Sequence, residues 1–116
     1  MQYVRNTDAA TQVLSDVQPP EKAAELMKGF NDQSAKVFTD PVTYDAYRHI
    51  PVSYILCERD AVLLPDWQMG RIEFLKKARA DGKVDVVRFD TGHCPNISKP
   101  EATARKVIEA LSEIGA

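Results

Sequence analysis

The hydrophobic positions from residue 51 onward form two kinds of pattern. Val52–Cys57 is a β-rich and nearly all apolar run, which is typical of a strand buried on both faces of a parallel sheet. Val84–Phe89 is predicted to be a second strand. Between and after these runs, apolar residues recur at helical spacing over Met69–Ala78 and Ala104–Ile114. Because the crossover contains a helix, we predict that the strands pair in parallel with a right-handed connection. The predicted order is strand, helix, strand, helix.

In the first half of the chain, the apolar residues have the spacing of two short helices. Apolar residues recur at helical spacing from Ala10 to Val17 and again from Ala23 to Phe30, with Pro19-Pro20 between the two stripes. We predict that the second helix runs from about Glu21 to Phe30 and that both stripes pack in a core. The segment from Asn31 to Arg48 lacks such periodicity and is predicted to be irregular, with a helical turn near Tyr44 and Tyr47.

The last helix has a start signal and a stop signal. Ser98 and Glu101 have the spacing of a capping box, and Pro100 is tolerated in a first helical turn. Gly115 follows the final apolar residue and is a typical helix stop. We therefore expect the Ser98 side chain to cap this helix.

Composition narrows the class of protein. The chain has 116 residues, of which 44% are hydrophobic and 28% charged, and its net charge is −2. These values are typical of one globular domain and argue against a nucleic-acid binder. No apolar run approaches the length of a membrane span, and Met1–Asp8 lacks the apolar core of a signal peptide. Since Cys57 and Cys94 do not make a disulfide framework, we expect a reduced, cytoplasmic protein without membrane or nucleic-acid partners.

One carboxylate and one imidazole follow the two predicted strands. Asp60 comes after the first strand and His93 after the second, and functional groups of open α/β sheets gather beyond the carboxyl ends of the strands. An acid that orients a histidine is two-thirds of a hydrolytic triad. In the alternative interpretation, Asp60 is a solvated turn residue and His93 an ordinary loop residue. His49 has no metal-ligand pattern and the five glycines are scattered, so we expect neither a metal nor a cofactor.

The residues around this pair carry a family resemblance. The stretch Ile50–Asp60 resembles the strand and acid loop of the α/β-hydrolase family, and Thr91–Glu101 resembles the loop that carries that family's histidine. The nearest branch is the esterase and hydroxynitrile-lyase-like one, in which a glutamine follows the acid loop, as Gln68 does here. The resemblance implies that Asp60 is the triad acid and His93 the triad base of an acyl-transfer reaction on a small ester-like substrate.

The resemblance also implies a division of the chain. Residues 1–49 look like part of the branch's helical cap. Residues 50–116 look like the C-terminal strand-helix-strand-helix portion of an α/β-hydrolase domain. The expected fold class is therefore α/β, with two parallel strands, flanking helices and a partial cap. Six aromatic side chains are candidates for a substrate pocket or for core packing: Tyr3, Phe30, Phe38, Tyr44, Tyr47 and Trp67.

The family's nucleophile motif, Gly-x-Ser-x-Gly, does not occur in these residues. The serines are Ser15, Ser34, Ser53, Ser98 and Ser112. Cys57 is expected to be a buried small hydrophobe, and Cys94 is a poor candidate because adjacent residues usually point apart. We therefore expect a truncated hydrolase without triad turnover of its own.

Two other functions stay open. A second chain that supplies the nucleophile would complete a half-enzyme, or the chain is a small non-catalytic interaction module. In every case the strand Val52–Cys57 is predicted to have an unpaired edge. Because two parallel strands are marginally stable by themselves, we expect weak stability or self-association through this edge.

Overall fold

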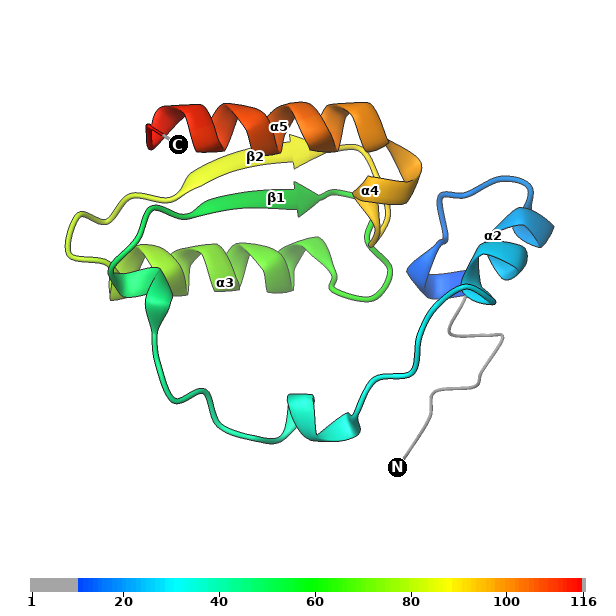
Figure 1. Cartoon of the computed structure of the whole chain (residues 1–116), viewed down its shortest axis with the longest axis horizontal. Coiled ribbons are helices and arrows are strands. Elements are labelled where there is room, and N and C mark those ends of the chain that lie inside the picture. Colours follow the sequence, from blue (N-terminus) through cyan, green and yellow to red (C-terminus); the bar gives the residue numbers. More distant parts are fainter. Residues whose placement is uncertain (1–10, 116) are drawn as a thin grey trace.

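A computed structural model describes residues 11–115 (Figure 1). Its elements in chain order are α2 (Pro20–Met27), the 3₁₀ turns η1 (Ala35–Phe38) and η2 (Ala46–Arg48), β1 (Ser53–Cys57), α3 (Pro65–Ala78), β2 (Asp85–Phe89), α4 (Pro95–Ser98) and α5 (Pro100–Glu113). The predicted order of strand, helix, strand, helix is confirmed, with the short α4 inserted before the last helix.

The two strands form a parallel sheet in which Ser53 pairs with Asp85 and Cys57 with Phe89. Figure 1 shows the strands lying between α5 and α3. The apolar face of α3 explains why this helix packs on the sheet, since Ile72 on that face is only 1% exposed. This arrangement is part of an α/β fold, as predicted.

Burial on the sheet is less complete than the strand pattern predicts. Leu56 and Cys57 at the end of β1 are buried, whereas Ser53 at its start is exposed. The apolar stripe of α5 is also open to solvent, at Val107, Ile108, Leu111 and Ile114. The prediction of a strand buried on both faces is therefore wrong for the start of β1. The physical reason is that the sheet has two strands within the described residues, so few neighbours cover its faces.

The N-terminal region packs as a small cluster. Helix α2 ends at Met27 rather than at the predicted Phe30, because Lys28 and Gly29 form a turn. Of the first predicted helix, residues 11–13 are helical, while Ala10 lies outside the described residues, as does Tyr3. The buried residues of this region and the side chains packed against them are Leu14, Val17, Ala23, Val13, Met27, Cys94 and Ile97. Packing of the N-terminal stripes is thus confirmed for Leu14, Val17, Ala23 and Met27. It is wrong for Leu26 and Phe30, which are 37% and 45% exposed.

The segment 31–44 is exposed throughout, but η2 after it is fastened to the C-terminal end of α3. The Arg79 guanidinium donates to the backbone carbonyls of Tyr47 and Ile50, and Arg48 donates to the carbonyl of Ala78 at 3.1 Å. The η2 turn confirms the predicted helical turn near Tyr47. These bonds hold the entry to β1 in place.

The aromatic candidates do not share one environment. Tyr44 stacks on His49, and Tyr47 makes an edge contact with Phe74. The Arg71 guanidinium lies over the Trp67 ring, whereas Phe38 is 81% exposed. Core packing is therefore wrong for Phe30, Phe38, Tyr44 and Trp67, which are exposed, and a place in a substrate pocket stays a prediction.

The last helix is not capped as predicted. Ser98 belongs to α4, and the residue before α5 is Lys99, which makes no side-chain cap bond. Ser98 Oγ instead donates to the Cys94 carbonyl at 3.4 Å. The insertion of α4 directly before Pro100 uses Ser98 in its own turn, and this explains the difference. In the part of the chain that the structure describes, no helix has the length and apolar character to cross a membrane.

Candidate active site

Asp60 lies in the turn that follows β1, and the fold buries it to 5% exposure. Its Oδ1 accepts hydrogen bonds from the backbone N–H groups of Val62 at 2.8 Å and Leu63 at 2.9 Å. Such a turn, closed by an Asp side chain onto the next backbone amides, is a local preference of this residue type. The two bonds offset the cost of burying a carboxylate and leave Oδ2 free to face another group.

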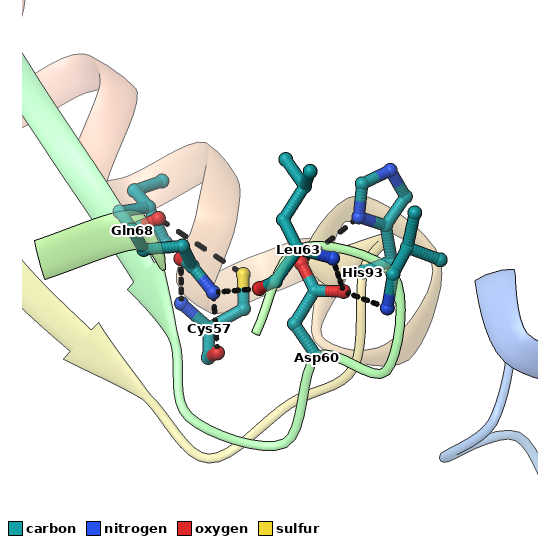
Figure 2. A network of polar contacts seen from close by, with 7 residues as sticks. Cys57, Asp60, Leu63, Gln68 and His93 are labelled. Carbon is teal, nitrogen blue, oxygen red and sulfur yellow. Dashed lines mark hydrogen bonds and ion pairs between the residues drawn. The ribbon is translucent and has the colours of Figure 1, made fainter. Parts of the chain in front are cut away.

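That other group is the imidazole of His93. His93 Nδ1 lies 2.9 Å from Asp60 Oδ2, with the His93 side chain 30% exposed and that of Asp60 4% exposed (Figure 2). Because a carboxylate only accepts hydrogen bonds, Nδ1 carries the proton in this contact and Nε2 is left as the acceptor. The structure thus brings together the two side chains that the sequence singled out. Their catalytic role stays a prediction.

The sheet explains why the two loops meet. Beyond the last pair of β1 and β2, the Glu58 N–H donates to the Phe89 carbonyl at 2.9 Å and the Arg59 N–H to the Thr91 carbonyl at 3.0 Å. The parallel pairing therefore continues into both loops. Neighbouring parallel strands lie about 4.8 Å apart, so side chains that leave these loops on the same side are within hydrogen-bond reach.

A second acidic residue, Asp16, contacts the loop that carries the histidine. A Cβ atom added to Gly92 would lie 2.6 Å from Asp16 Oδ1, so a larger residue before His93 would displace the Asp16 side chain. Burial opposes ionisation of Asp16, but the Gly92 backbone, the Ser98 side chain and the more distant charge of Arg59 outweigh it and lower the pKa of this carboxyl. Asp16 could not be predicted from the sequence, because the helical spacing of Leu14 and Val17 marks neither of the two residues between them.

The sulfur and hydroxyl groups near the site are weak nucleophile candidates. Burial, as the largest cause, raises the pKa of the Cys57 thiol, and burial together with the Asp16 and Asp60 charges raises the pKa of the Cys94 thiol. A raised pKa means less thiolate, which is the reactive form. Ser53 starts β1, at the opposite end of the strand from Asp60. The burial expected for Cys57 is confirmed.

No group of three or more His, Cys, Asp or Glu side chains that could hold a metal ion occurs among residues 11–115. His49, the second histidine, is stacked on Tyr44 with ring centroids 5.7 Å apart.

Comparison with known proteins identifies relatives of this chain. A model of the alpha/beta hydrolase family matches residues 3–106. The chain is 45% identical over 76 residues to "Probable hydrolase R7" of Phoma sp. (strain ATCC 20986 / MF5453), an alignment that covers 66% of this chain and 31% of that protein. It is 26% identical over 108 residues to "Alpha/beta hydrolase nvfD" of Aspergillus novofumigatus (strain IBT 16806), covering 93% of this chain and 41% of that protein.

The chain thus spans between 31% and 41% of the length of these curated relatives. The family match extends over the N-terminal region, the sheet and the first half of α5. It includes both loops that bring Asp60 and His93 together. On this evidence the chain belongs to the alpha/beta hydrolase family.

Proposed function

We propose that this chain contributes the acid and the general base of a serine esterase, which hydrolyses the ester bond of a small molecule. The observation that carries the proposal is the 2.9 Å contact between Asp60 Oδ2 and His93 Nδ1. This distance lies in the ~2.6–3.2 Å range of a productive catalytic hydrogen bond. The resemblance of the two loops to the esterase branch supports the ester substrate.

The mechanism follows from the atoms that the pair presents. His93 Nε2 takes the proton of a nucleophilic hydroxyl as its oxygen attacks the ester carbonyl, and then returns the proton to the departing alcohol. Asp60 keeps the proton of the resting imidazole on Nδ1 and stabilises the imidazolium that forms. Water then attacks the acyl group by the same route, with His93 again accepting and returning a proton.

The nucleophile is proposed to come from residues outside these 116. Gly-x-Ser-x-Gly does not occur in the sequence, and the relatives are longer than the matched segment. Within residues 11–115 one edge of β1 has no strand partner, and a neighbouring strand would join the sheet there. A truncated hydrolase lacks this group, whereas in a half-enzyme a second chain supplies it.

The test compares the chain alone with the chain completed by the polypeptide encoded directly upstream. We expect turnover of an activated aryl ester only in the completed sample, with loss of turnover in His93→Ala. His49→Ala is the matched control, since His49 stacks on Tyr44 away from this contact. Turnover by the chain alone that survives removal of both cysteines but not His93→Ala would contradict an outside nucleophile. A completed sample without turnover would contradict the esterase.

Self-association is the second candidate function, and one surface favours it. A groove of about 280 Å³ lies between β1 and α5, and its apolar lining includes Pro51, Ile55 and Leu111. An exposed apolar groove beside an unpaired strand edge is a typical contact surface. We expect light scattering to show a mass above that of a monomer and Ile55→Lys to reduce it, whereas a cooperative melt of a monomer would contradict this proposal.

A further inference from the structure

Gln68 is a polar side chain that the proposed mechanism does not use, yet it is only 2% exposed. Its Oε1 accepts from the Cys57 N–H at 3.0 Å, and its Nε2 donates to the carbonyls of Cys57 at 3.0 Å and Leu63 at 2.7 Å. Figure 2 shows the amide lying beside the end of β1, with the acid loop on its other side. Three hydrogen bonds from one buried amide indicate a specific requirement at this place.

The first two bonds replace a neighbouring strand. The Val52 carbonyl accepts from the Asp85 N–H and the Glu58 N–H donates to the Phe89 carbonyl, so residues at even positions of β1 face β2. In a parallel ladder the backbone groups of alternate residues point to opposite edges. The N–H and C=O of Cys57 therefore point to the unpaired edge, where the Gln68 amide bonds both of them as a peptide group would.

The third bond reaches the other end of the acid loop. Asp60 lies between Cys57 and Leu63, and the Leu63 N–H donates to Asp60 Oδ1. The Gln68 amide therefore holds the residue where the loop leaves the strand and the residue that orients the carboxylate. Without these bonds, the loop could rotate and move Oδ2 away from His93.

We propose that Gln68 is a positioning residue: its amide sets the orientation of Asp60 and, through Asp60, keeps the proton of His93 on Nδ1. The inference rests on the acid and base roles proposed above. A glutamate at this position retains an acceptor for the Cys57 N–H but cannot donate to the two carbonyls. A methionine has a similar length and makes none of the three bonds.

The test reads the tautomer of His93 directly in the full 116-residue chain. Long-range ¹H–¹⁵N correlation spectra distinguish Nδ1–H from Nε2–H, and His49 and His93 are the two histidines in the sequence. We expect Nδ1–H in the wild type. In Gln68→Met and Gln68→Glu, the ratio of Nδ1–H to Nε2–H should fall at least about tenfold, the change expected when one hydrogen bond to a charged group is lost.

Three controls separate positioning from general damage. Gln12→Met changes an exposed glutamine and should leave the ratio unchanged. The ring signals of His49 and the amide cross peaks of β1 and β2 should persist in the Gln68 variants. In an Asp60→Asn background, Gln68→Met should produce little further change, because Gln68 acts through Asp60.

Each outcome decides one question. A wild-type His93 that carries its proton on Nε2 overturns the acid and base pair, and with it the proposed function. A wild-type Nδ1–H that persists in folded Gln68 variants overturns the positioning role alone. If Gln68→Met loses the strand cross peaks, Gln68→Glu decides, because it keeps the bond to the Cys57 N–H. If both variants lose the strands, Gln68 acts in folding and the positioning role is overturned.

Discussion

The segments 11–50 and 53–113 differ in how their backbone is held. In 53–113 a parallel ladder, two long helices and the buried Leu56 and Ile72 fix the chain. In 11–50 much of the backbone is irregular, and 31–44 is exposed throughout. The described contacts of the first segment with the second include the cluster at Cys94 and Ile97 and the bonds of η2 to α3. The acid and histidine belong to the segment with the fixed backbone, and this explains how two loops hold a 2.9 Å contact.

The two segments should differ most in how kcat responds when an aspartate is replaced by asparagine. Asp60→Asn in the completed enzyme should lower kcat about 10⁴-fold, the order of magnitude found when the acid of a triad becomes an amide, because the imidazole loses its orienting acceptor. Asp32→Asn in the exposed segment is the matched control and should change kcat little. Esterase assays at neutral pH measure both, and equal effects would contradict a specific role of Asp60.

Core truncations should separate the segments by stability. Leu56→Ala removes a side chain with 0% exposure and should lower the free energy of unfolding by about 2–5 kcal/mol, since it leaves a cavity in the packed core. Phe38→Ala removes a side chain that is 81% exposed and should stay within about 0.5 kcal/mol of the wild type. Urea denaturation measures both values. A Phe38→Ala loss as large as that of Leu56→Ala would show that the exposed segment has a hidden core role.

The same substitution at two glycines should change stability in opposite directions. Gly92→Ala places a Cβ 2.6 Å from Asp16 Oδ1, where the segments touch, and should cost about 1–3 kcal/mol as an overpacked contact. Gly70→Ala in α3 meets nothing within 4 Å and should stabilise by about 0.5–1 kcal/mol, since alanine loses less entropy in a helix. Thermal melts measure both. The loss of stability caused by Gly92→Ala should be smaller in an Asp16→Ala background. An unchanged loss would show that the added Cβ clashes with another group.

The smallest effect concerns the pH dependence of the contact between the segments. Burial by itself would raise the pKa of Asp16, but the hydrogen bonds with the Gly92 backbone and the Ser98 side chain outweigh it. The pKa of Asp16 is therefore lower in the folded protein. The contribution of ionised Asp16 to the free energy of unfolding is therefore complete above the ordinary carboxyl pKa of about 4. It is lost as the pH falls through the lowered pKa of the folded state. Asp16→Asn should make the loss of stability between about pH 5 and pH 3 shallower. Asp32→Asn is the control, and an unchanged acid limb in Asp16→Asn would contradict this role.

Local patterns predicted most of the segment 53–113. Strand runs and helical spacing depend on neighbours along the chain, so β1, α3, β2 and α5 could be placed to within a few residues. The order of strand, helix and strand then implied parallel pairing, and parallel pairing implied that the loops after Cys57 and Phe89 meet. The positions of Asp60 and His93 beyond the strands could be predicted for this reason.

Other features depend on neighbours in space. The capping signal at Ser98 was misleading because α4 forms directly before α5. The apolar stripe of α5 predicted a covered face, but coverage depends on which elements lie opposite, and in the described residues its side chains are exposed. The end of α2 was placed too late because Lys28 and Gly29 turn the chain.

By itself, the sequence determined the α/β order of the elements and the pair Asp60 and His93, because these follow from periodicity and from the ends of strands. Only the tertiary structure decided how the pair is held. The Gln68 amide bonds Cys57 and Leu63, and Asp16 lies against Gly92. These contacts join residues that no local pattern relates, since they depend on the direction in which each side chain leaves a folded backbone.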